Sequence, residues 1–457
     1  MSEETPMFKQ YNEVKGKLAP GTIVLFRLGD FFEMFDDDAK IASNILGLTL
    51  TARHERPMAG MPAHALDAYV KRLLDAGKKV AVCDQLETAQ AGRLVKRELT
   101  RVYTPGTALN AEHLQAEHNQ YLLSLHQVGP TLVASWMELS TGEWCVGAAN
   151  AHEDFLTFLT LLQPAELIVP EEGLAPGLKE RLIENLPGLS VSELPNSFFE
   201  PIGARRILCE ALNVATLKGF GLNDDHPTIG VSGALYSYAK QALCAAPANL
   251  REIKLQSFEN RLLIDPNTAR QLEIFKDLSG SKDGSLIRAL NSTMTSAGSR
   301  LLEKVLLSPE CEPAPLEARY NAIDALSSDV EGLRNLRESL SLLRDLERIL
   351  GRLQNRLRSP RELAATRDTL RALPSLKAQL EKFSASNPAH LSWILNAIDP
   401  HTDLCKRLGE ALEEEPSNDF STGGFIRPGF DAELDRLKAL SANHKIWIAE
   451  LERTEQE

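Results

Sequence analysis

The amino-acid sequence predicts a multidomain protein in which two α/β regions are followed by a mostly α-helical region. The chain has 457 residues, which is more than one hydrophobic core usually serves, and a prior of about 150 residues per domain suggests roughly three domains. Segments rich in β-branched residues alternate with helical patterns up to about residue 245. Beyond residue 265 strand patterns nearly vanish, and leucines recur at helical spacing.

The first hundred residues predict a compact α/β module that ends near YTPGT, residues 103–107. The apolar segment TIVLFRL predicts a strand that is closed by Gly29 and Asp30. The segment DDDAKIASNILG predicts a helix that ends at Gly47 and carries carboxylates in its first turn, where they stabilise the helix dipole. A second helix and a second strand follow. In chain order the predicted elements are 22–28, 36–47, 64–77 and 78–85.

Residues 118–245 predict a second α/β region. The segments TLVASWMEL and EWCVGAA flank the turn Ser140-Thr141-Gly142, an arrangement typical of a β-hairpin. The short apolar run AELIVP, residues 165–170, is consistent with a further strand.

The rest of the chain predicts helices. SPRE, residues 359–362, has the pattern of a capping box with Ser359 as N-cap, so a helix should begin there. The segment 423–430, GGFIRPGF, interrupts the helical pattern, and the helical segment 431–457 after it carries no stop signal, so we expect the sequence to end within a helix. Leucines at steps of three or four describe one face of a long helix or of closely linked helices. They are Leu333, Leu336, Leu340, Leu343, Leu346, Leu350, Leu353 and Leu357.

The composition is that of a globular protein with an uneven charge distribution. The net charge of −13 disfavours nucleic-acid binding over the whole surface. Residues 1–107 hold 15 Lys and Arg against 14 Asp and Glu, whereas residues 108–457 hold 35 against 49, so a polyanion is repelled least by the first region. The six cysteines form no C-x-x-C pair, which predicts neither a zinc site nor a disulfide framework.

Targeting and membrane signals point to a cytoplasmic protein. No apolar run approaches the roughly 18 to 20 residues that span a bilayer. The N-terminal segment MSEETPMFKQ is acidic and polar where a signal peptide is basic and then apolar.

Candidate catalytic features are few. The run Asp36, Asp37 and Asp38 allows a metal-dependent nuclease, because hard cations bind clustered carboxylates. However, consecutive side chains point in different directions, and a solvated helix N-terminus explains the run better. His54 and His64 have no carboxylate or nucleophile at a telling spacing and are interpreted as structural. No G-x-x-x-x-G-K-[ST] phosphate loop occurs, so we predict no enzymatic activity for the residues present.

The segment GDFFEMF, residues 29–35, allows two interpretations. By composition its phenylalanines and Met34 are core residues and Glu33 points to solvent. Alternatively, the glycine turn before them projects one Phe and the neighbouring Glu33 from the surface. Such a pair suits insertion into a stack of flat groups with polar edges, such as nucleic-acid bases.

Several sequence blocks occur in the order in which one known family has them. With GDFFEMF they include PMAGMPAHALDAYVKRLL, LVKRELTRVYTPGT, ELSTGEW, LLIDPNTARQLEI, LNSTMTSAGSRLLEKVLLSP, RDLERILGRLQ and GGFIRPGFDAELD. On these blocks the sequence resembles the MutS family of DNA mismatch repair proteins over essentially its whole length. The resemblance implies a mismatch-recognition domain at 1–115, a connector domain at 116–250, a helical lever domain at 251–422 and a truncated clamp domain at 423–457.

The resemblance also implies which residues contact DNA. Phe31 and Glu33 fall on the family's Phe-x-Glu motif, so Phe31 would enter a mispaired duplex from the minor groove and kink it, and Glu33 would contact the mispaired base. Arg53, Lys96 and Arg97 would bind backbone phosphates. Met58 would pack beside the inserted phenylalanine. The segment 51–60 is shorter than is usual in the family.

The implied partner is double-stranded DNA with mismatches or small loops, bound by a cytoplasmic, nucleoid-associated homodimer of bacterial type that works with a MutL-type repair partner. ATP and Mg²⁺ are implied for the full-length family member, whose C-terminal ATPase domain these residues lack, so no cofactor is expected for this chain. Two alternatives stay open: a metal-dependent nuclease at the Asp36 carboxylate cluster, and an inactive truncated scaffold.

Overall fold

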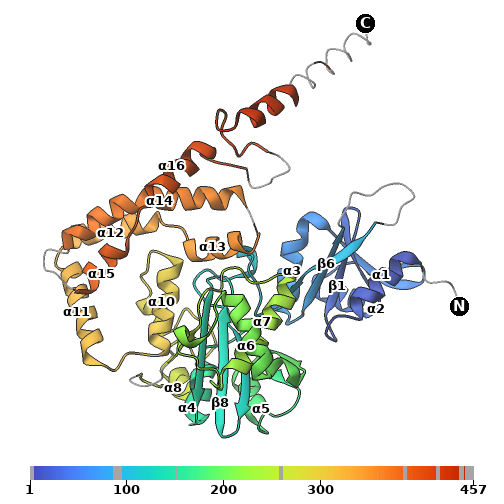
Figure 1. The fold of residues 1–457 in the computed structure, drawn as a ribbon, viewed down its shortest axis with the longest axis horizontal. Helices are drawn as coiled ribbons and strands as arrows, with labels where there is room; N and C mark the ends of the chain where they lie inside the picture. Colours follow the sequence, from blue (N-terminus) through green and yellow to red (C-terminus); the bar gives the residue numbers. More distant parts are fainter. Residues whose placement is uncertain are drawn as a thin grey trace. The chain divides into compact units, whose positions relative to one another are not determined.

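The computed structural model contains two α/β modules followed by helices (Figure 1). The structure describes residues 5–85, 95–150, 152–256, 261–357, 359–383, 389–417, 423–441 and 447. The chain divides into two compact units, Met1–Pro313 with Leu350–Asn355 and Ala314–Ile349 with Arg356–Glu457. The predicted fold class, α/β regions followed by a mostly helical region, is therefore confirmed.

The first module is a six-stranded sheet of order β3-β4-β2-β1-β5-β6. Its strands are β1 (Ile23–Leu28), β2 (Phe31–Phe35), β3 (Thr51–Arg53), β4 (Arg56–Pro62), β5 (Val80–Gln85) and β6 (Arg97–Tyr103). β1 is central: it runs antiparallel to β2 and parallel to β5. Its apolar residues are buried on both faces, which explains why this segment is continuously hydrophobic and does not alternate.

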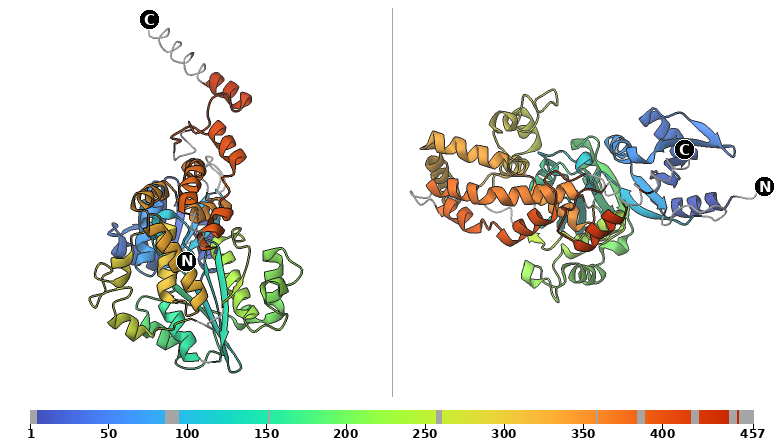
Figure 2. Two further views of the ribbon diagram at one scale, coloured as in Figure 1. Left: turned by 90° about the vertical axis from the view of Figure 1, so that its left-hand side faces the viewer. Right: turned by 90° about the horizontal axis from the view of Figure 1, so that it is seen from above.

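Helices cover both faces of the first sheet, which is drawn in blue in Figures 1 and 2. α2 (Asp36–Leu46) and α3 (Leu66–Asp75) pack on one face, and α1 (Pro6–Lys15) packs on the other. The strand expected at 22–28 and the helix expected at 36–47 are confirmed, and Gly47 ends α2 with a left-handed φ of 70°. A 3-10 turn, Ala63–Ala65, precedes α3, so this helix begins two residues later than expected.

The second module is a six-stranded sheet of order β11-β10-β7-β8-β9-β12. Its strands are β7 (Leu122–Val128), β8 (Thr131–Glu138), β9 (Glu143–Ala149), β10 (Glu166–Pro170), β11 (Ser190–Leu194) and β12 (Lys254–Leu255). The predicted hairpin is β8 and β9, and the apolar run at 165–170 is β10, paired in parallel with β7 and β11. β10 is fully buried, as expected of a parallel strand covered on both faces.

Helices again cover both faces of the second sheet. α4 (His152–Leu161) and α5 (Leu178–Asn185) pack on one face around Phe155 and Leu182. α7 (Ile229–Leu243) packs against β7 and β8 on the other face, with α6 (Pro201–Leu212) beside it; both are green in Figures 1 and 2.

Further helices complete the first unit and form the second. The first unit continues with α8 (Pro266–Gln271), α9 (Leu286–Leu290) and α10 (Ser296–Leu307). The further helices are α11 (Pro313–Ser327), α12 (Val330–Ser341), α13 (Leu346–Gln354), α14 (Pro360–Glu381), α15 (Ala389–Ala397) and α16 (Thr402–Ala411). Residues Leu350–Asn355 at the end of α13 belong to the first unit. The regularly spaced leucines thus belong to linked helices rather than to one long helix. The second unit has its own core around Leu336, Leu376 and Phe383.

Two expectations for the C-terminal part are tested only in part. α14 begins at Pro360, as the capping-box pattern predicts, but the Ser359 side chain accepts no bond from the amides of the first turn. The helix expected at 431–457 is present at 432–441, and most of its remainder lies outside the described residues. Within the described part of the chain, no helix is long and apolar enough to cross a membrane.

Candidate nucleic-acid interface

Strand β2 divides the residues of GDFFEMF between two cores and the surface. Side chains alternate across a strand, so Phe32 and Met34 enter the core under α2 and α3, and Phe35 enters the core under α1. These three side chains are at most 1% exposed. Phe31, the first residue of β2, is 50% exposed. Both interpretations of the segment are therefore partly right: it is a core strand with one phenylalanine at the surface.

Phe31 is exposed because it follows a tight turn at the edge of the module. Gly29 and Asp30 connect β1 to β2, and Gly29 has a positive φ of 63°, a conformation that glycine adopts without steric cost. Phe31 pairs with Leu28 on β1 and with Pro62 on β4, the last residue of that strand. The aromatic side chain is thus held at a rigid strand end.

Glu33 lies two residues beyond Phe31 on the same strand face but does not point freely to solvent. Both of its carboxylate oxygens accept hydrogen bonds from Nη1 of Arg53, at 2.9 and 2.7 Å. The Glu33 side chain is 13% exposed and that of Arg53 41% exposed. The expectation of a solvated Glu33 is therefore corrected: the carboxylate is ion-paired and mostly covered.

A hairpin that the sequence analysis did not identify delivers Arg53 to this position. β3 and β4 are joined by the two-residue turn His54-Glu55, in which both residues have positive φ, 47° and 65°, as in a type I′ turn. The His54 ring lies 6.3 Å from that of Phe8, so the turn curls toward the face covered by α1. The signal for it was the shortness of the segment 51–60.

Arg56 secures the same hairpin. Its guanidinium pairs with the carboxylate of Asp36 and lies 4.4 Å from the centre of the Phe8 ring. A cation over an aromatic face and an ion pair together hold the turn end of the hairpin against α1 and α2.

The guanidinium of Arg97 makes its contacts with other residues of the first module. Its Nε donates to the carbonyl of Arg27 at 2.7 Å, and its guanidinium lies 5.2 Å from the centre of the Phe26 ring. Burial and, to a smaller degree, the positive charge of Arg53 lower the pKa of Arg97. Lys96 is exposed and forms an ion pair with Glu98 at 2.6 Å. Of these two, Lys96 has the accessible charge.

Met58 does not lie beside Phe31. It sits within β4 opposite Phe35, four residues along the strand pair from Pro62, the partner of Phe31. Its side chain packs against the core that contains Phe8 and Tyr11. The expected contact between Met58 and Phe31 is therefore not found; the strand register places Met58 at the other end of β2.

The three consecutive aspartates do not converge on a shared point. Asp36 pairs with Arg56, Asp37 with Lys40, and the buried Asp38 with Lys15. Asp38 also accepts hydrogen bonds from the Tyr11 hydroxyl and the amide of Val24. Burial and the Asp38 carboxylate raise the pKa of Tyr11. Among the residues that the structure describes, no cluster of three metal-ligating side chains is present. The run thus supports the fold of α2.

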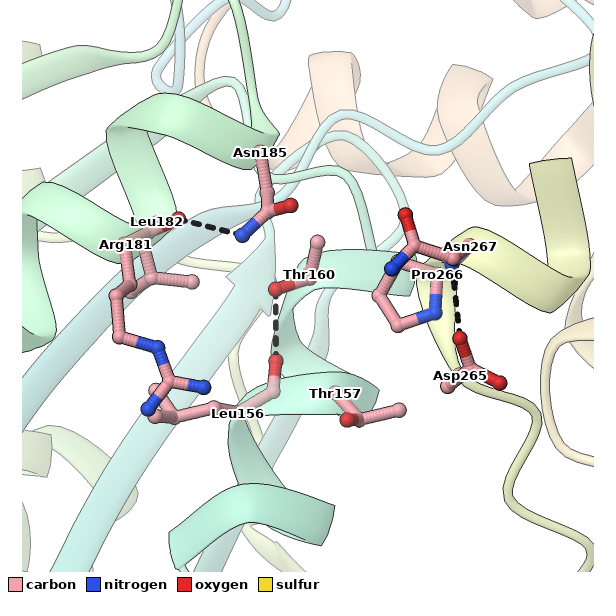
Figure 3. A pocket seen from close by; sticks show the side chains of 9 residues that line it. All are labelled: Leu156, Thr157, Thr160, Arg181, Leu182, Asn185, Asp265, Pro266 and Asn267. Atoms are coloured by element: carbon pink, nitrogen blue, oxygen red, sulfur yellow. Dashed lines mark hydrogen bonds between the residues drawn. The ribbon is translucent and has the colours of Figure 1, made fainter.

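A small cavity beside the second sheet is lined by polar side chains that form hydrogen bonds with nearby backbone groups (Figure 3). It has a volume of about 170 Å³ and lies between α4, α5 and the start of α8. Asp265 accepts from the amide of Asn267, Thr160 donates to the carbonyl of Leu156, and Asn185 donates to the carbonyl of Arg181. These polar side chains therefore form hydrogen bonds with the backbone of their own segments.

Comparisons with known proteins agree along the whole chain. Residues 5–112 match the family description MutS domain I, residues 120–253 match MutS domain II, and residues 267–457 match MutS domain III. Among curated relatives, the DNA mismatch repair protein MutS of Thermosynechococcus vestitus is 34% identical, with 99% of this chain and 53% of the relative covered. That of Myxococcus xanthus is 36% identical, with 99% and 51% covered. That of Alkaliphilus oremlandii is 32% identical, with 100% and 53% covered. The chain spans about half the length of the curated relatives it matches.

Proposed function

The chain belongs to the MutS family of DNA mismatch repair proteins, and from this premise we propose that its first α/β module recognises mispaired or looped duplex DNA through Phe31 and Glu33. The observation that carries the proposal is the placement of β2. Three of its apolar side chains are buried, whereas Phe31 is half exposed at a rigid strand end, two residues from an oriented carboxylate.

The physical basis for recognition by Phe31 is mechanical. An apolar wedge that enters the minor groove unstacks neighbouring bases and kinks the duplex, which costs a few kcal/mol. The cost is lowest where pairing is already defective, so a mismatched site yields more readily than a matched one. Because Phe31 belongs to a six-stranded sheet, its position would resist the force that the displaced bases exert on it.

Glu33 would act on the edge of the displaced base. A carboxylate oxygen accepts a hydrogen bond from a base N–H. Glu33 thus adds chemical selection to the mechanical selection by Phe31.

Backbone contacts would come from cations of the same module. We propose that Lys96 lies near a phosphate, since such contacts set register without reading sequence. Arg53 was expected to do the same, but its guanidinium is paired with Glu33. Arg97 and Met58 would contribute by supporting the sheet, because the Arg97 guanidinium is bonded internally and Met58 packs under α1.

The larger organisation is also proposed from the family. Residues 1–115 would form the mismatch-recognition domain, 116–250 the connector, 251–422 the lever, and 423–457 the start of the clamp. The acidic residues beyond 107 suit a scaffold better than a DNA surface.

From the family resemblance we also propose that the whole protein forms a homodimer in the cytoplasm, works with a MutL-type partner, and is gated by ATP and Mg²⁺. The 457 residues contain no G-x-x-x-x-G-K-[ST] sequence, so no residue of this chain is assigned to a nucleotide phosphate.

Substitution of Phe31 by Ala tests the proposal. The variant should lose the preference for a mismatched over a matched duplex while keeping weak, salt-sensitive binding. Phe430 is a matched control, because it is also an exposed phenylalanine, at 43%, in another part of the chain. Phe430→Ala should keep the preference.

Other outcomes favour the alternatives. Retained preference in Phe31→Ala would refute the role of Phe31. Metal-dependent cleavage of DNA that disappears in Asp36→Ala would favour the nuclease, and absence of duplex binding by the unmodified chain would favour the inactive scaffold.

A further inference from the structure

Arg53 forms an ion pair with Glu33, which lies two residues from Phe31 on β2. A single nitrogen, Nη1 of Arg53, donates to both carboxylate oxygens of Glu33, at 2.9 and 2.7 Å. The two residues are twenty positions apart, on β3 and β2, with β4 between these strands in the sheet. The contact therefore exists only because the β3–β4 hairpin curls over the sheet.

The burial of the pair makes this contact more than an ordinary surface ion pair. Exposed ion pairs contribute little because water screens them, but the Glu33 side chain is only 13% exposed. A mostly covered carboxylate without a partner is unfavourable, and Arg53 removes that penalty. Gly60 lies directly opposite Glu33 on β4, and a Cβ there would be 3.8 Å from the Glu33 Cγ, so the glutamate stem is flanked by backbone.

The hairpin holds Arg53 in place before any ligand binds. The His54-Glu55 turn joins the two strands, Arg56 anchors the turn end through Asp36, and the His54 ring lies near that of Phe8. A group placed in advance loses little conformational freedom on binding. The Arg53 side chain is also 41% exposed, so it remains accessible to a ligand.

We propose that Arg53 is a positioning residue for Glu33: it holds the Glu33 carboxylate beside Phe31 and neutralises its charge, so that the carboxylate can be brought close to DNA phosphates. The proposal rests on the proposed function of the module. It differs from the simpler role expected from the sequence, in which Arg53 contacts a phosphate independently of Glu33.

The two roles of Arg53 predict different DNA affinities when the charges of Arg53 and Glu33 are removed together. The wild-type pair has no net charge, Arg53→Met leaves a bare carboxylate, and Arg53→Met with Glu33→Gln is neutral again. If Arg53 acts through Glu33, the double variant should bind matched duplex nearly as well as wild type. If Arg53 contacts a phosphate by itself, the double variant should be as weak as Arg53→Met, and both should have a lower salt dependence.

The test measures binding of the complete chain to matched and mismatched duplexes over a range of salt concentrations. We expect Arg53→Met to weaken binding to matched duplex about fivefold, and Glu33→Gln in the same chain to restore it to within about twofold. Arg53→Lys should bind like wild type, because one nitrogen makes both contacts with Glu33. Arg72→Met is the control for loss of one positive charge, since Arg72 on α3 donates to the carbonyl of Ile45 and not to Glu33.

A second measurement does not depend on DNA. In the free chain, Arg53→Met and Glu33→Gln should each increase the rate of amide hydrogen exchange in the β3–β4 hairpin. The double variant should increase this rate no further. Additive changes in exchange, or equal DNA affinities for Arg53→Met and the double variant, would overturn the proposal. If Phe31→Ala abolishes mismatch preference while the Arg53 and Glu33 effects are additive, the proposed function stands and only this inference fails. If wild type does not bind duplex, the proposed function and the role of Arg53 on DNA both fail, and hydrogen exchange still decides whether the contact exists.

Discussion

The Nζ of Lys79 lies 3.2 Å from Oε1 of Glu166, so a residue at the start of a strand in the first module reaches a carboxylate that is completely buried in the second. Further donors surround the same carboxylate: the hydroxyls of Thr104 and Tyr238, each at 2.5 Å, and that of Ser192 at 2.8 Å. Burial and the Glu166 carboxylate raise the pKa of Tyr238, so its hydroxyl remains a donor. Glu166 therefore joins the two α/β modules.

Substitution of Glu166 by Gln should strongly destabilise the junction of the two modules. It keeps the shape of the side chain but leaves the positive charge of Lys79, whose side chain is 16% exposed, without its partner. Breaking a buried pair from one side costs about 3 kcal/mol. Urea unfolding followed by the fluorescence of the buried Trp136 and Trp144 measures the loss.

Removing both charges provides the control for this prediction. Lys79→Met with Glu166→Gln should be more stable than Glu166→Gln alone, because no uncompensated cation remains. Equal stability of the single and double variants would mean that the positive charge of Lys79 is not destabilising in the absence of the Glu166 carboxylate.

Adjacent phenylalanines should differ sharply in their contribution to stability. Phe32 is 1% exposed in the core under α2 and α3, so Phe32→Ala should cost about 3 to 5 kcal/mol. Phe31 is half exposed, and Phe31→Ala should change stability by less than about 1 kcal/mol. Hydrogen exchange of peptides from β1 and β5 in the complete chain distinguishes the two; similar losses of protection would contradict the strand register.

Gly351 should be required for stability, because it lies where α13 contacts the turn between β8 and β9. A Cβ on Gly351 would lie 2.1 Å from the carbonyl oxygen of Ser140, a distance that no side chain tolerates. Gly351→Ala should destabilise by about 1 to 3 kcal/mol, since steric overlap exceeds the gain in helix propensity of about 1 kcal/mol. Thermal unfolding is the measurement.

Gly203 on α6 is the matched control for Gly351. It is also a helical glycine, but nothing lies within 4 Å of the position of its Cβ. Gly203→Ala should stabilise by about 0.5 to 1 kcal/mol. Stabilisation by both alanines would show that α13 does not approach Ser140 closely.

The stability of the first module should fall as the pH falls below about 6.5, the usual pKa of an unfolded histidine. Burial lowers the pKa of His113, more than its hydrogen bond to the backbone of Asp67 raises it. The unfolded chain then binds a proton at a higher pH than the folded chain does, so acidification favours unfolding until the lowered pKa is also passed.

His113→Gln should make this loss shallower. Unfolding midpoints at pH 7.5 and pH 5.5 measure the effect. Some dependence should remain, because burial also lowers the pKa values of His126 and His226. An unchanged difference between the two pH values in His113→Gln would exclude His113 as a source.

The sequence predicted the parts of this protein that depend on local order. Hydrophobic periodicity and glycine stops located β1, α2 and the β8–β9 hairpin, because each of these patterns repeats within a few residues. The order of the sequence blocks that resemble the family indicated the MutS family, and the comparisons confirm it. Composition also separated a nearly neutral first region from an acidic remainder.

Only the tertiary structure decided which of the candidate residues lie together. Helices cover both faces of β2, so Phe32 and Phe35 are buried on opposite faces, whereas Phe31 is half exposed because it is the first residue of the strand, beside the β1–β2 turn. Strand register separates Met58 from Phe31, and the β3–β4 hairpin pairs Arg53 with Glu33 across twenty residues. Contacts between residues distant in sequence follow from register and from the path of a turn, which composition and periodicity do not encode.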